Sequence, residues 1–248
     1  MYNIVDRIYI GMIPENATLA LTGLGLCLPI ISIVTAFANL FGMGGAPLCS
    51  IERGRGNLEE AEKIMGNSFA MMVVTGIILT VLGLAFKRPM LYLFGASDDT
   101  IPYAESYITI FHMGVQGAAL ATIISQFLSA AWIVAFLTGK KTILRLKASA
   151  FRVEAKRALR IVGLGLSGFT MSLTNSSVQI MYNAMLQKVG GDLYVGIMTV
   201  INSVREVISM PVTGVTNSAQ PVLGFNYGAG EYKRVRGGIV FMSLCCII

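Results

Sequence analysis

The distribution of charge along the chain is the feature that most constrains its fold. Long apolar stretches carry few charged side chains, and the charges gather in short segments between these stretches. A helix needs about 20 mostly apolar residues to cross the hydrocarbon core of a bilayer. The sequence therefore predicts an all-α, polytopic membrane helical bundle with spans over 1–13, 17–50, 65–87, 118–137, 158–186 and 194–226, and a last span that begins at 237.

Composition supports a membrane protein over a soluble one. Of the 248 residues, 54% are hydrophobic and 13% are charged, and the mean hydropathy is +0.69. Ordinary globular domains have roughly a quarter of their residues charged. The formal net charge of +6 comes from basic residues in short loops, so we expect no nucleic-acid partner. Without metal-ligand cysteine spacing or an HExxH, GxSxG or Walker motif, we expect no metal site, no cofactor and no enzyme activity.

Lysine and arginine in the connecting loops predict the orientation of the spans. Loops 51–64, 138–157 and 227–236 lie on one side of the predicted membrane and carry thirteen of these residues. Loops 88–100 and 187–193 lie on the other side and carry two. Since cytoplasmic loops are enriched in lysine and arginine, we expect the first set in the cytoplasm of a bacterial cell, with the chain in the inner membrane.

Two loop motifs indicate an internal repeat. PLCSIERGRG (Pro47–Gly56) and PVLGFNYGAG (Pro221–Gly230) match in one proline and two glycines without a gap, and we call their constant separation along the chain the repeat offset. Glycine pairs of this kind also cap helix C-termini, and both interpretations can hold. Four predicted spans separate the motifs, so both face the same compartment and the repeat is parallel. Parallel repeats are typical of transporters with a binding cavity between two halves.

Polar side chains recur along one face of several predicted spans. At the repeat offset, a triplet at i, i+3 and i+7 in one span aligns with a triplet in a later one: Ser32, Thr35 and Asn39 with Glu206, Ser209 and Thr213. Lipid offers these groups no hydrogen-bond partners, so the stripes must face other helices or a wet cavity. We favour a substrate cavity lined by Asn175, Gln179, Asn183, Asn202, Glu206, Thr35 and Asn39.

The first segment carries an acidic residue at membrane depth. Asp6 shares a helical face with Tyr2 and Asn3, which could hold a protonated acid or help to coordinate a small cation. The alternative is that Asp6, beside Arg7, is an interfacial residue. The sequence by itself leaves these two readings open.

Several segments together resemble the bacterial MATE family of multidrug and toxic-compound efflux transporters. They are YNIVDRIYIG (2–11), GMGGAPLCSIERGRGNLEEAEKIMGNS (42–68), GVQGAALATIISQ (114–126) and PVLGFNYGAGEYKRVR (221–236). The resemblance implies two lobes related by the parallel repeat and antiport of cationic amphiphiles against protons or sodium. It matches Asp6 to the family's first-helix acid of the cation-coupling site, with Asn3 and Tyr2 beside it. It also places Gln179 and Asn183 in the cavity of the second lobe.

The chain departs from the family pattern in length. ITIF (108–111) passes directly into HMGVQG (112–117), where the family has about two further spans, and most helices after the eighth are absent. The sequence therefore predicts a partial MATE-like fold with a shortened N-terminal lobe (1–137), a basic cytoplasmic linker (138–157) and the start of a C-terminal lobe (158–248). We also expect that such a shortened chain can self-associate.

Three functions are compatible with these features. The first is efflux of organic cations by secondary antiport, and the second is an inactive membrane-embedded fragment of such a transporter. The third is a lipid-linked sugar flippase of related architecture, which would favour many basic residues in its cavity. Only Arg160 and Arg205 lie clearly inside the predicted spans, which favours efflux over lipid-linked sugar transport.

Overall fold

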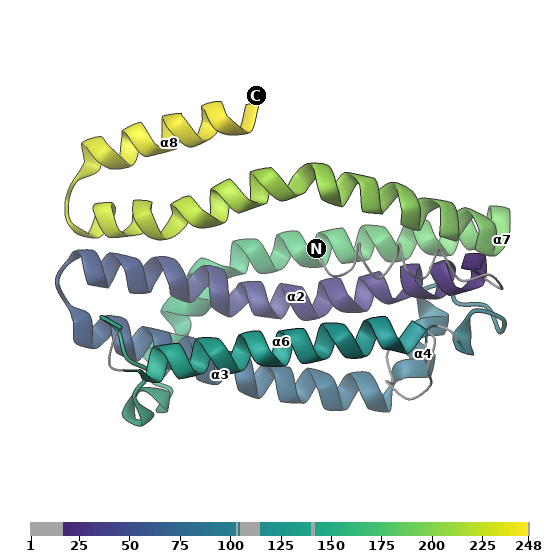
Figure 1. Ribbon diagram of the computed structural model, residues 1–248, viewed down its shortest axis with the longest axis horizontal. Helices are drawn as coiled ribbons and strands as arrows, with labels where there is room; N and C mark the ends of the chain where they lie inside the picture. Colours follow the sequence, from purple (N-terminus) through teal and green to yellow (C-terminus); the bar gives the residue numbers. More distant parts are fainter. Residues whose placement is uncertain (1–16, 103, 105–114, 140–141, 248) are drawn as a thin grey trace. The chain divides into compact units, whose positions relative to one another are not determined.

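The computed structural model describes residues 17–102, 104, 115–139 and 142–247, and these are helical along most of their length (Figure 1). The all-α prediction is confirmed for this part of the chain. Its helices are α2 (Ala17–Gly54), α3 (Leu58–Ala85), α4 (Lys87–Leu93), α6 (Val115–Thr138), α7 (Ala155–Gly228) and α8 (Tyr232–Ile247), with a short 3-10 helix, η1 (Ala148–Phe151).

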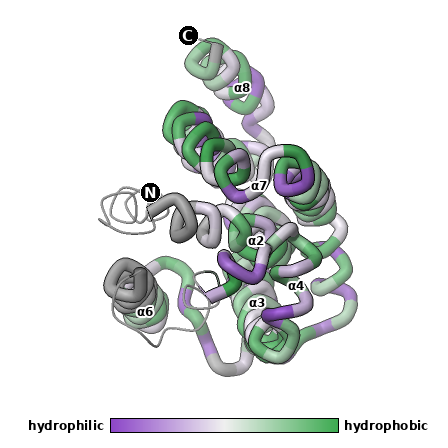
Figure 2. The backbone as a smooth tube through the Cα atoms, turned by 90° about the vertical axis from the view of Figure 1, so that its right-hand side faces the viewer, coloured by the Kyte–Doolittle hydropathy of each residue, from purple (hydrophilic) through white to green (hydrophobic). Residues whose placement is uncertain are grey.

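Three of these helices are long and apolar enough to cross a membrane within the described residues. They are Gly25–Gly54, Leu58–Ala85 and Ala155–Gly228, and the shorter Phe127–Thr138 is also apolar. In Figure 2 the tube is coloured mainly as hydrophobic along α3 and α7. The predicted spans at 17–50 and 65–87 are confirmed as helices, although α2 continues to Gly54, and α3 begins earlier, at Leu58, and ends at Ala85.

Helix α7 contains two predicted spans that are joined by a sharp reversal. Gly191 has φ 61° and ψ −158°, which is non-helical, and the chain turns back there (Figure 1). Glycine adopts this backbone conformation readily because it lacks a Cβ atom. We call 155–190 the first arm and 192–228 the second arm of α7. The prediction of a loop over 187–193 is therefore correct in place, although the turn is much tighter than expected.

The predicted loop over 88–100 is partly wrong, because its first half is the short helix α4. Pro89 stands in the first turn of α4, where a missing backbone N–H costs little. Leu91 and Phe94 are buried, at 0% and 3% exposure. Burial of these side chains stabilises a short helix that propensity alone would not predict.

The C-terminal ends of α2 and α7 have the same backbone hydrogen bonds. After α2, Asn57 N–H donates to the Glu52 carbonyl at 2.9 Å and Gly56 N–H donates to Arg53 at 3.1 Å. The same two bonds recur at the repeat offset, from Glu231 to Asn226 at 2.9 Å and from Gly230 to Tyr227 at 3.1 Å. Gly56 and Gly230 have φ of 81° and 80°. Both helices therefore end in a Schellman motif, and the expected capping glycines are confirmed at both repeat positions.

The chain divides into two compact units. Unit 1 consists of the described parts of Met1–Thr35, Ile77–Ala131 and Met171–Val207. Unit 2 consists of the described parts of Ala36–Gly76, Trp132–Thr170 and Ile208–Ile248. Each unit contains residues from both predicted lobes, so the lobe boundaries stay a prediction.

Each unit has its own apolar core. In unit 1 the buried residues come from α2, α4, the segment after α4 and the second arm of α7: Leu26, Cys27, Leu91, Ala104 and Val195. In unit 2 they come from α2, α3 and the first arm of α7: Leu40, Phe41, Leu48, Ile64 and Ile161. Phe37 and Phe169 add an edge-to-face ring contact to unit 2, with centroids 5.0 Å apart.

Candidate functional site

The predicted cation-coupling residues Asp6, Asn3 and Tyr2 lie outside the described residues. Their role stays a prediction. The predicted cavity residues all lie within the described part of the chain. Six of them belong to unit 1, and Asn39 belongs to unit 2.

Two predicted cavity residues make hydrogen bonds between helical segments of unit 1. The Asn202 amide nitrogen donates to the Tyr182 hydroxyl at 2.7 Å, which joins the two arms of α7. The Ser32 hydroxyl donates to the Gln179 side-chain oxygen at 3.5 Å, which joins α2 to the first arm of α7. Part of the polar stripe therefore serves helix packing.

The other predicted cavity residues differ in exposure. Asn183 is buried, at 5% exposure, close to the reversal of α7. Asn175 and Thr35 are exposed, and Glu206 is half-buried. The Thr35 hydroxyl donates to the Ile31 carbonyl of its own helix at 2.7 Å, so its polar group is already satisfied locally.

A polar cluster around Asp192 was not predicted from the sequence. The Asp192 carboxylate accepts hydrogen bonds from the Ser97 hydroxyl at 3.1 and 3.2 Å and from the Gln187 side-chain amide at 2.9 Å. Its backbone carbonyl accepts a bond from the Thr22 hydroxyl at 2.8 Å. Asp192 thus ties the reversal of α7 to α2 and to the segment after α4. The signal in the sequence was an acid directly after Gly190 and Gly191, between two polar stripes.

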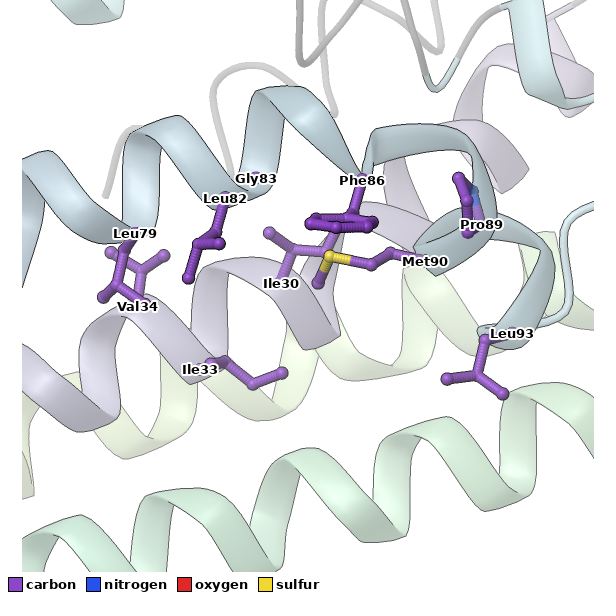
Figure 3. Close-up of a pocket in the computed structure, with 10 residues that line it drawn as sticks. All are labelled: Ile30, Ile33, Val34, Leu79, Leu82, Gly83, Phe86, Pro89, Met90 and Leu93. Carbon is purple, nitrogen blue, oxygen red and sulfur yellow. The ribbon is translucent and has the colours of Figure 1, made fainter.

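Unit 1 also contains an apolar cavity of about 410 Å³ (Figure 3). Ile30, Leu82, Phe86 and Met90 are among the side chains that surround it, from α2, α3, the bend after α3 and α4. Its lining residues are apolar throughout. A cavity of this kind can accept a hydrocarbon group, but it supplies no ligand for a metal or a polar cofactor.

In unit 2, the buried side chain of Asn67 holds the basic linker against α3. Its amide nitrogen donates to the carbonyls of Ala150 at 2.9 Å and Arg152 at 3.1 Å. Its amide oxygen accepts from the N–H of Glu154 at 2.9 Å. Asn67 is 0% exposed, so the linker provides its hydrogen-bond partners in place of water.

Ion pairs join the same elements of unit 2. Arg157 of α7 contacts both carboxylate oxygens of Glu60 in α3, at 2.8 and 3.0 Å. Arg160 lies 3.2 Å from Glu52 of α2. A bidentate arginine–carboxylate pair fixes geometry as well as charge. The linker end and the first turns of α7 are therefore held on α2 and α3.

At the start of α7, Glu154 accepts a hydrogen bond from Arg157. This bond, together with the nearby positive charges, lowers the pKa of the Glu154 carboxyl below its ordinary value. Glu154 is exposed, so the effect on stability is small.

Apolar helices, helix ends repeated at a fixed offset and polar contacts between helical segments define an integral membrane protein with a parallel internal repeat. The sequence model of the MatE family matches residues 1–142 and 154–248. The chain therefore belongs to the MatE family, whose members are transporters, and the resemblance seen in the sequence is confirmed.

Two relatives carry the name multidrug export protein MepA. The protein from Staphylococcus haemolyticus is 27% identical over 127 residues, which cover 51% of this chain and 28% of that protein. The protein from Staphylococcus saprophyticus is 19% identical over 305 positions, which cover all of this chain and 66% of that protein. The chain thus spans less than two thirds of the length of either relative in these matches.

Solved structures share the fold. One, described as protein A, superposes with a TM-score of 0.88 at 26% identity, covering 97% of this chain and 64% of that one. Another is described as the inward-facing conformation of a multidrug resistance MATE family transporter of the MOP superfamily. It has a TM-score of 0.77 at 18% identity and covers 97% of this chain and 65% of that one.

Proposed function

We propose that this chain takes part in the efflux of cationic amphiphiles by secondary antiport, with protons or sodium as the coupling ion. The observation that carries the proposal is the MatE match over nearly the whole chain. The relatives named multidrug export protein support the substrate class. The positive-inside pattern supports a multi-pass orientation in the bacterial inner membrane, with the basic loops in the cytoplasm.

The polar groups of unit 1 suit a cavity wall for such substrates. The side-chain amides of Gln179, Asn183 and Asn202 can accept or donate hydrogen bonds without placing a charge in the membrane. Glu206 adds a half-buried carboxyl group on the second arm of α7. A cationic amphiphile would place its charge near such a carboxyl and its apolar body against helix side chains.

The decisive residue for coupling is Asp6. A carboxyl group at membrane depth favours its protonated form unless a cation holds it charged, so it can exchange a proton for sodium or for a substrate cation. Efflux of ethidium from proteoliposomes, driven by an imposed proton or sodium gradient, is the assay. We expect Asp6→Asn to abolish gradient-driven efflux while membrane insertion is unchanged. Equal efflux by the Asn variant would place coupling elsewhere, with Glu206 as the next carboxyl to substitute.

A second candidate function is an inactive membrane fragment, and one observation favours it. The match to the Staphylococcus saprophyticus protein is 305 positions long, whereas the chain has 248 residues. At least 57 positions of that relative, 305 less 248, therefore have no counterpart here. The same proteoliposome efflux assay distinguishes the two candidate functions. Efflux by a version with a two-span insertion after residue 111, but not by the chain as it stands, would support the fragment.

A further inference from the structure

The two repeat-related helix ends lie against each other inside unit 2. The backbone of Gly54 in α2 faces the Phe225 carbonyl oxygen of α7, and a Cβ atom on Gly54 would overlap that oxygen. Gly228 faces the carbonyl oxygen of Ile51 in the same way. Gly228 is the repeat equivalent of Gly54, and Phe225 is the equivalent of Ile51, both at the repeat offset. The two contacts are therefore equivalent to each other under the repeat.

Such reciprocity is the property of a two-fold interface, in which residue i contacts j and the equivalent of j contacts the equivalent of i. A third contact locates the axis. Ser50 and Gly224 are themselves equivalent at the repeat offset. A Cβ atom on Gly224 would lie 3.0 Å from the Cβ of Ser50. Because a residue meets its own equivalent only at the axis, a local two-fold axis passes between Ser50 and Gly224.

The chemistry of this interface allows it to part and re-form. A glycine backbone against a carbonyl oxygen gives close packing and a weak Cα–H···O contact. The Arg53 guanidinium lies 5.5 Å from the centre of the Phe225 ring, a modest cation–π contact near the surface. The matching Schellman motifs satisfy carbonyls at both helix ends from within each end, so parting of the two ends would leave these capping bonds intact.

We propose that Gly54 and Gly228 form a gate at the end of unit 2 that carries the basic loops. In this structure the gate is closed by the two glycine–carbonyl contacts. In transporters built from repeats, access alternates as one half moves against the other, so a contact on their common axis must break when that end opens. The role as a gate rests on the proposed transport function, whereas the contact and its opening can be measured without transport.

The first experiment measures opening as the reactivity of a reporter thiol in native membranes. Cys49, Cys245 and Cys246 are replaced by Ala, Ser50→Cys supplies the reporter, and the buried Cys27 is kept as an internal standard. A water-soluble maleimide is the probe, and mass spectrometry reads both sites. A methyl group at the gate cannot fit without displacing backbone, so we expect Gly54→Ala or Gly228→Ala to raise the labelling rate at position 50 about three- to tenfold.

The controls are Gly42→Ala in α2 and Gly214→Ala in α7, where an added Cβ would meet no atom within 4 Å. These variants should leave labelling at position 50 unchanged, and Cys27 should stay protected in all four variants. Unchanged labelling at position 50 in the gate variants would overturn the proposal. A parallel rise at Cys27 would also overturn it, because the glycines would then support the fold as a whole.

The double variant tests whether the two contacts belong to one gate. Opening through either glycine releases both contacts, so Gly54→Ala with Gly228→Ala should label position 50 within about twofold of either single variant. If the increase in labelling rate of the double variant equals the product of the two single increases, the glycines are two independent packing sites, which would contradict a single gate.

A disulfide lock links the gate to transport. Ser50→Cys combined with Gly224→Cys places two thiols across the axis, and oxidation should join them. In proteoliposomes that export ethidium, the cross-link should stop efflux and a reductant should restore it. Continued efflux by the cross-linked chain would overturn the gate. Efflux that is absent before oxidation, with the labelling pattern as expected, would count against the proposed transport function and leave the gate supported.

Discussion

The polar contacts inside unit 1 differ in kind from those inside unit 2. In unit 1, hydroxyl and amide groups meet one carboxylate, Asp192, and one another across helices. In unit 2, carboxylates of α2 and α3 pair with arginine and lysine of the linker and of α7. Each unit contains segments of the same four helices, α2, α3, α6 and α7. The contrast therefore comes from which segments of these helices belong to each unit.

The contrast follows from where charge is tolerated. Full charges are expensive in hydrocarbon, whereas hydroxyl and amide groups can pair there at little cost. The charged residues of unit 2 stand at helix ends and in the linker, at the end that the positive-inside rule assigns to the cytoplasm. Ion pairs can therefore position the linker there without a large desolvation cost.

The largest expected effect tests whether the linker is held mainly by a neutral side chain. Asn67→Ala removes three hydrogen bonds, one of them to the carbonyl of the buried Ala150, so the free energy of unfolding should fall by about 2–4 kcal/mol. Denaturation in mixed detergent micelles measures it. The matched control is Asn226→Ala, whose side chain donates to the Val222 carbonyl of its own helix at 2.8 Å. A similar loss in both variants would remove the special role of Asn67.

The next effect concerns the carboxylate at the reversal of α7 in unit 1. Asp192→Asn replaces one acceptor oxygen by a donor beside Ser97 and Gln187, so we expect a loss of about 1–3 kcal/mol in the free energy of unfolding. The exposed Asp99→Asn is the control and should change it by less than about 0.5 kcal/mol. If Asp192→Asn is as mild as the control, the Asp192 carboxylate contributes little to the stability of unit 1 beyond its apolar packing and its other polar contacts.

A smaller effect separates two ion pairs of α3. Glu60 is partly buried against Arg157 and makes two contacts, whereas Glu59 is exposed and pairs with Lys63 at 2.6 Å. Glu60→Gln should lower the free energy of unfolding by about 1 kcal/mol, and Glu59→Gln by less than about 0.5 kcal/mol. Raising the salt concentration should weaken the Glu59 pair more. Equal losses would show that burial of the pair does not matter.

The smallest effect is a pH dependence at Glu154. Its hydrogen bond from Arg157 lowers the pKa of this carboxyl in the folded chain. The contribution to stability is therefore complete above the ordinary pKa of 4.5 and is lost as the pH falls through the lowered value. Thermal unfolding of the native chain and of Glu154→Gln should differ slightly at neutral pH and converge in acid. A difference that grows in acid would reverse the sign and contradict the pair.

Much of the fold could be predicted because a membrane-spanning helix needs a long apolar segment, which can be recognised directly in the sequence. The spans at 17–50 and 65–87, the reversal near 187–193 and the capping glycines at 56 and 230 all follow from apolar length, loop charge and turn chemistry, which are local properties. Helix α4 escaped prediction because it depends on burial of Leu91 and Phe94, which only the folded chain provides.

For the candidate site, less could be predicted from the sequence than for the fold. The sequence by itself determined that polar groups such as Asn202 share one face of an apolar helix, because spacing of three and four residues fixes the face of a helix. It also determined that two helix ends are equivalent. Only the tertiary structure decided that Asn202 bonds Tyr182, that Asp192 gathers Ser97, and that the two equivalent ends touch each other through Gly54 and Gly228. Periodicity specifies which side of a helix is polar, whereas the partner across from it depends on how distant segments pack.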